Sequence, residues 1–109
     1  MSDSEVVDIE HLRVVVFEDD DIWVAQCLEY DIGAQGPDVA TLQKRFRIAL
    51  LAELEVSLEK GDEPFSGIDP APEFYHNLWD SCSGRFVPKE GTSIRSNRHA
   101  VELETALCA

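Results

Sequence analysis

LRVVVFEDDDIWVAQCLEYDIGAQGPDVATLQKRFRIALLAELEVSL, residues 12–58, carries the strongest structural signal in the chain. Residues 12–17 and 22–28 are rich in β-branched and aromatic side chains, which favours two β-strands. Four adjacent carboxylates separate them: Glu18, Asp19, Asp20 and Asp21. Because like charges resist burial together, we expect a solvated four-residue hairpin loop there. A third, short strand at 32–35 would end before Gly36-Pro37.

A long helix is predicted over about residues 38–60. Asp38 can accept hydrogen bonds from the free first-turn amides and lies at the positive end of the helix dipole. Gly61, after Lys60, is a typical stop signal. Apolar residues recur at helical spacing and predict one stripe against the sheet: Val39, Leu42, Phe46, Ala49 and Leu50. Segment 48–52 is apolar nearly all round, so we expect a second layer over it, from this chain or another protomer.

The order of these elements is similar to that of the HicB-like antitoxins. Three segments carry the resemblance: Val15-Val16-Phe17 before an acidic hairpin, Trp23-Val24-Ala25-Gln26-Cys27-Leu28, and Asp31-Ile32-Gly33-Ala34-Gln35-Gly36 before the helix. It covers roughly the first half of the chain. It implies a reduced ribonuclease-H-like fold without nuclease chemistry that binds a small toxic ribonuclease. The family usually has Thr at the helix start with Glu nearby, where this chain has Asp38, Ala40 and Thr41.

The second half contains a shorter helix pattern. We expect this helix over about residues 70–82, with Asp69 as its cap and prolines confined to the first turn. Pairs of residues four apart form an aromatic ridge along it: Phe74, Tyr75, Leu78 and Trp79. We expect this ridge to cover the apolar middle of the long helix; an exposed ridge would instead mark a protein interface or line a ligand pocket.

The C-terminal residues alternate between apolar and polar side chains, which predicts a final strand at about 99–107. A right-handed crossover would lay it parallel beside the first strand. Residues 84–97 are expected to be a connection, and its basic residues are more typical of a solvated loop than of a phosphate site: Arg85, Lys89, Arg95 and the following Arg98. The prediction is one α+β domain over residues 1–109, with a four-stranded sheet in β-β-β-α-(α)-β order and the long helix packed on one face.

Composition constrains compartment and partners. Nine Lys and Arg residues against 22 Asp and Glu give a net charge of −13 among 109 residues. Nucleic acid is a poor partner for so acidic a chain, whereas a small basic protein is a good one, although excess acid also serves solubility alone. Cys27, Cys82 and Cys108 are odd in number and lack C-x-x-C spacing, which predicts no disulfide framework and a reducing cytosol. The acidic start and lack of a long apolar run predict a cytoplasmic protein without a membrane span.

These patterns predict a noncatalytic protein-binding module. No catalytic or metal-binding motif accompanies the carboxylates or the scattered histidines, so we expect no catalytic residues, no metal and no cofactor. Few residues follow the final strand, so we expect no operator-binding segment and no direct DNA binding. A homo-oligomer, a dimer or higher, is expected through sheet edges or the apolar helix face. The candidate acidic partner surface comprises Glu18, Asp19, Asp20, Asp21, Glu29 and Asp31. The alternative is a solitary HicB-like domain with a structural, oligomerisation or small-ligand role.

Overall fold

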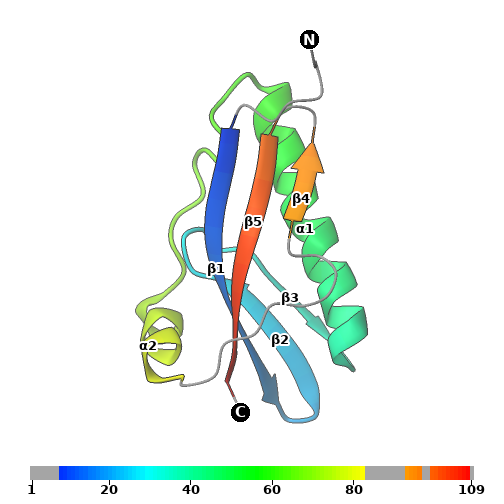
Figure 1. Cartoon of the computed structure of the whole chain (residues 1–109), viewed down its shortest axis with the longest axis vertical. Helices are drawn as coiled ribbons and strands as arrows, with labels where there is room; N and C mark the ends of the chain where they lie inside the picture. The colour runs from blue at the N-terminus through cyan, green and yellow to red at the C-terminus, as the bar shows by residue number, and fades with distance from the viewer. Residues whose placement is uncertain (1–7, 83–92, 97–98, 109) are drawn as a thin grey trace.

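A mixed β-sheet with a helix on each face organises the part of the chain that the structure, a computed structural model, describes: residues 8–82, 93–96 and 99–108 (Figure 1). Its elements in chain order are β1 (Asp8–Asp19), β2 (Ile22–Cys27), β3 (Gly33–Gly36), α1 (Val39–Glu59), α2 (Glu73–Ser81), β4 (Ser93–Ser96) and β5 (His99–Cys108). The α+β class, the expected order of elements and the long helix on one sheet face are confirmed.

The described strands lie in the order β3-β2-β1-β5-β4. β1 pairs antiparallel with β2 and parallel with β5, as the crossover rule predicts. The parallel register runs from Asp8 beside His99 to Phe17 beside Cys108, so β1 begins earlier than the predicted residue 12. β4 is a fifth strand at the edge, antiparallel to β5. The prediction that residues 84–97 are wholly a connection was therefore wrong. Three of the basic residues predicted to lie in a solvated loop are outside the described residues: Arg85, Lys89 and Arg98.

The β1–β2 hairpin closes more tightly than predicted. Asp19 pairs with Ile22, so the loop has two residues rather than four. Both loop residues have positive φ, 53° at Asp20 and 66° at Asp21. Two positive φ angles in succession match the right-handed twist of paired strands, and Asp tolerates this region better than most residues. The strands therefore continue into the acidic segment and carry Glu18 and Asp19 with them.

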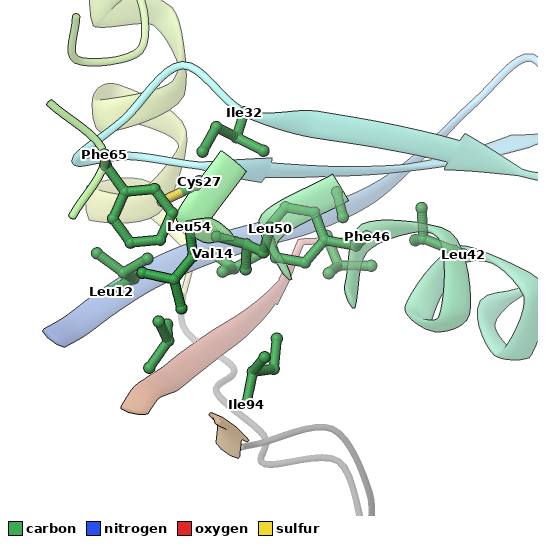
Figure 2. Packing of buried hydrophobic residues seen from close by; sticks show 13 residues of the cluster. Leu12, Val14, Cys27, Ile32, Leu42, Phe46, Leu50, Leu54, Phe65 and Ile94 are labelled. Atoms are coloured by element: carbon green, nitrogen blue, oxygen red, sulfur yellow. The ribbon is translucent and has the colours of Figure 1, made fainter. Parts of the chain in front are cut away.

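The larger core lies between α1 and one face of the sheet. Alternate residues of β1, including Leu12, Val14 and Val16, point to this face. The long helix meets them with a stripe at helical spacing: Leu42, Phe46, Leu50 and Leu54 (Figure 2). Asp38 caps the helix, because its side chain accepts a hydrogen bond of 2.7 Å from the amide of Thr41. The predicted cap and most of the predicted stripe are confirmed.

The second helix lies on the opposite face of the sheet. Trp79 of α2 is 6% exposed and packs with Val15, Leu28 and Ala106 in a separate cluster. The expectation that the aromatic ridge covers the middle of α1 was therefore wrong. Val14, Val15 and Val16 are all buried, and because successive side chains alternate, both faces of β1 need cover. α2 supplies the cover on the face that α1 leaves open.

The predicted start of α2 also needs correction. The helix begins at Glu73 after Pro72, which provides no side-chain cap, and not at residue 70 after a cap by Asp69. The backbone groups just before the helix make hydrogen bonds to another segment. The carbonyl of Asp69 accepts from the amide of Asp31, and the amide of Ala71 donates to the carbonyl of Leu28. These bonds tie the segment to the end of β2 and hold it out of the helix.

A disulfide links Cys82, at the end of α2, to Cys108 in β5. Their Cα atoms lie 5.4 Å apart, within the usual range for a cross-link. The expectation of three unpaired cysteines was wrong, because sequence spacing does not reveal that α2 returns to the end of β5. Cys27 is the buried free thiol.

Candidate functional site

A groove lies between the β1–β2 hairpin and the start of α2. Its volume is about 400 Å³, and its lining residues are Phe17, Glu18, Asp19, Val24, Gln35, Phe74 and Tyr75. The hairpin turn and α2 lie toward the same end of the molecule (Figure 1). The groove brings together two sets of residues that the sequence suggested separately: part of the acidic hairpin and part of the aromatic ridge.

Strand pairing builds the floor of the groove. Phe17 of β1 pairs with Val24 of β2, and Val24 pairs with Gln35 of β3. Directly paired residues point to the same face of a sheet, so these three side chains form a row across it on the side of α2. Asp19 lies two residues after Phe17 and therefore shares that face. The sequence reading missed Phe17, Val24 and Gln35 as site residues, although their alternate positions in the strands were a usable signal.

The first turn of α2 supplies the aromatic wall. The Tyr75 ring lies 6.3 Å from the Phe17 ring and 5.1 Å from the Phe74 ring, which it meets edge to face. Phe74 is 63% exposed, so most of its ring surface is open to solvent. In contrast, Trp79 belongs to the buried cluster between α2 and the sheet, and Leu78 packs against that cluster, as Tyr75 also does. The predicted ridge is thus divided: its C-terminal half anchors the helix and its N-terminal half lines the groove.

The rim beside this wall is strongly acidic. Glu18, Asp19, Asp20 and Asp21 are all exposed at the hairpin. No ion pair joins any of the four to a cation within the described residues. Four carboxylates around a two-residue turn produce a concentrated negative potential beside an apolar surface, which suits a ligand that carries both a cation and an apolar stem.

Glu29 and Asp31 lie at the other end of β2, about 17 Å along the strand from the hairpin turn by strand rise. Glu29 accepts from the backbone amide of Arg13 at 2.8 Å and from its Nε at 2.6 Å. Asp31 accepts from Nε2 of Gln26 at 3.0 Å. The six predicted acidic residues therefore do not form one surface: four gather at the hairpin and two serve internal contacts.

A second hollow, of about 440 Å³, lies beside Glu29. Its charged groups are largely paired, because Arg13 bonds Glu29 and Nδ1 of His11 lies 3.6 Å from a carboxylate oxygen of Glu102. The guanidinium of Arg13 also lies 5.7 Å from the ring centre of Trp79. These contacts connect the sheet to α2, so we assign this hollow a structural role.

Cys27 is a buried thiol at the end of β2 whose acidity is strongly reduced. Burial, opposed by backbone hydrogen bonds and reinforced by the nearby Glu29 carboxylate, raises the pKa of its thiol to about 11. A thiol held neutral in this way is a poor nucleophile at neutral pH. Cys27 therefore acts as part of the core.

Within residues 8–82, 93–96 and 99–108, no group of three or more His, Cys, Asp or Glu side chains is arranged to hold a metal ion. No helix in those ranges is long and apolar enough to cross a membrane. Comparison of the chain with protein-family models, curated proteins and solved structures finds no match.

Proposed function

We propose that this chain is a noncatalytic protein-binding module of the HicB-like antitoxin type, and that its groove binds a basic segment of a small ribonuclease toxin. The observation that best supports this proposal is that an exposed aromatic wall and an acidic rim lie together in one groove at the hairpin end of the sheet. The net charge of −13 supports the same class of partner, because an RNA-binding protein is usually basic. The sheet order, with the last strand parallel to the first, agrees with the fold that the resemblance implies.

An arginine or lysine side chain matches the groove in both its parts. Its cationic head could lie over the Phe74 ring, an interaction of about 0.5–1 kcal/mol at an exposed site. The carboxylate of Asp19, on the same sheet face as Phe17, would accept hydrogen bonds from the same head, while the stem covers Phe17. Because rim ion pairs contribute only about 0–1 kcal/mol each, the acidic surface serves mainly to accelerate and orient encounter.

A basic peptide tests the groove directly. A short peptide alternating arginine with small residues should perturb amide resonances of the hairpin and α2, with weaker binding at higher salt. Phe74→Ala should weaken binding about threefold, and Asp19→Asn should weaken it by a similar factor. Asp62→Asn is the matched control, because it removes one exposed charge beyond the end of α1. Equal loss in Asp19→Asn and Asp62→Asn would mean that only net charge matters, and the groove would have no role.

The antitoxin role needs a second experiment in the native host. The tagged chain should recover a small basic protein with ribonuclease activity, and purified chain should inhibit that activity at equimolar ratio. Recovery and inhibition should both fall in Phe74→Ala but not in Asp62→Asn. Recovery of no such protein, or inhibition that ignores both substitutions, would contradict the antitoxin assignment.

We place the module in the cytoplasm, where a ribonuclease toxin would meet RNA. The Cys82–Cys108 disulfide removes the argument for this location that rested on unpaired cysteines. In a reducing cytoplasm much of the population would carry this pair as thiols. Rapid alkylation of thiols in intact host cells measures that fraction, and a fully oxidised pair would contradict the location.

The second candidate is a solitary HicB-like domain that binds a small ligand. The groove volume favours it, since about 400 Å³ lies within the usual range for small-molecule sites. An aromatic wall beside carboxylates would select a small organic cation. The test is to compare a free arginine-like amine with a peptide that contains the same group. Saturable binding of the free amine, with the same affinity as the peptide, would favour small-ligand binding over protein recognition.

A further inference from the structure

The outer face of α1 is apolar at its centre. Ile48 is 61% exposed, Val56 is 46% exposed, and Ala52 between them is also exposed. Spaced by four residues, the three side chains follow one another along the helix surface. α2, the other described helix, packs on the far side of the sheet and gives this stripe no cover. An isolated exposed Ile is ordinary, but a continuous stripe on a helix is typical of a contact surface.

Charges on the same face are arranged by sign. Lys44 and Arg45 precede the apolar centre, whereas Glu55 and Glu59 follow it. At 3.6 residues per turn, Lys44, Ile48, Ala52, Glu55 and Glu59 fall within an arc of about 80°. Along this face cations therefore precede Ile48 and carboxylates follow Ala52, with Val56 between the two carboxylates in the chain.

The stability of α1 by itself does not account for this arrangement. Helix dipoles favour acidic side chains in the first turn and basic ones in the last, but beyond its Asp38 cap α1 has no acidic residue in its first turn and no basic residue in its last. Glu55 and Glu59 stand at i, i+4 spacing, where like charges repel. Lys44 and Glu55 are about 16 Å apart by helical rise, too far for pairing within the helix.

We propose that this face binds the same face of a second copy of the chain, with the two α1 helices antiparallel about a twofold axis near residues 50–52. A twofold contact places each patch against its own equivalent. Antiparallel alignment brings Lys44 of one protomer to Glu55 and Glu59 of its partner, at both ends of the pair. Ile48 and Ala52 then meet their counterparts at the centre.

Local charge pairing opposes long-range repulsion in this dimer. Each protomer carries −13, so two copies repel at low ionic strength. At physiological ionic strength the screening length is about 8 Å, so salt weakens the repulsion between distant charges more than it weakens the attraction within short ion pairs. Association should therefore strengthen from low to physiological salt. Sedimentation equilibrium of the full chain at both salt concentrations measures this.

Charge reversal tests the antiparallel arrangement. Lys44→Glu alone, or Glu55→Lys with Glu59→Lys, places like charges opposite each other and should weaken dimerisation at least tenfold. Combining all three substitutions restores opposite signs and should recover dimerisation to within about threefold. In a parallel dimer each residue would face its own copy, so none of these variants would show this loss and recovery. That result would overturn the proposed alignment.

The apolar centre has its own test. Ile48→Glu should make the chain monomeric without changing its circular dichroism, because Ile48 is exposed in the single chain. Ile9→Glu is the matched control, since Ile9 is 48% exposed on β1. A monomeric wild-type chain across accessible concentrations, or equal effects of the two substitutions, would refute the dimer. α1 and the groove lie on opposite sheet faces, so this result is independent of peptide binding.

Discussion

Removal of the Cys82–Cys108 cross-link is the perturbation whose magnitude follows most directly from the structure. The disulfide joins positions 26 residues apart in the chain. Closing a loop of that length removes denatured-state entropy equivalent to about 3.5 kcal/mol at room temperature on the chain-entropy model. We therefore expect Cys82→Ser with Cys108→Ser to lower the free energy of unfolding by about that amount. The melting temperature should fall by roughly 15 °C.

The assay is urea unfolding followed by circular dichroism, with and without a phosphine reductant. Wild-type protein should lose stability on reduction, and the double serine variant should not respond. Thiol titration of the denatured, unreduced chain should count one free thiol, Cys27, and reduction should raise that count by two. Hydrogen exchange should show that reduction loosens α2 most, because the link ties its end to β5.

Two outcomes would refute the reasoning. The first is an unchanged unfolding curve for wild-type protein after thiol titration has confirmed complete reduction. The second is a reductant effect of equal size in the double serine variant, which would assign the change to another source. A loss confined to α2, with the rest of the sheet unfolding as before, would show that the cross-link constrains a local unit rather than the whole domain.

Three further predictions concern stability. Asp38→Ala should lower the melting temperature at neutral pH. Hydrogen bonds from first-turn amides lower the pKa of Asp38 in the folded state, so its carboxylate stabilises the fold at neutral pH. Acidification that protonates Asp38 in the folded state removes this contribution, and the melting temperatures of the variant and the wild type should then converge. The pKa of Cys27 rises from 9.0 to about 11 on folding, so stability should decline with rising pH across that window, and Cys27→Ala should flatten the decline. Ser57→Ala should cost about 1–3 kcal/mol in urea unfolding, because the buried amide of Phe65 loses its acceptor at 3.0 Å, whereas exposed Ser66→Ala should cost almost nothing.

Local signals were sufficient for all the described elements except the short edge strand β4, and for their order. The β-branched runs around Val15 and Val24, the cap at Asp38 and the helical recurrence of Leu42 and Phe46 depend on residues close in the chain, so sequence reveals them. The parallel pairing of β1 with β5 followed as well, because a connection that crosses the sheet through a helix is the one that joins parallel strands. The acidity of the hairpin and its exposure needed no tertiary information.

What sequence by itself determined is thus the described elements other than β4, their order and the charge they carry. Only the tertiary structure decided which sheet face α2 covers, that Cys82 meets Cys108, and that Phe74 lies beside Phe17 and Asp19. The physical reason is that apolar burial has no direction: a helix with an aromatic ridge gains similar free energy on any apolar surface it can cover. The choice depends on where the chain between the helices is held, and backbone bonds at Asp69 and Ala71 hold it at the end of β2.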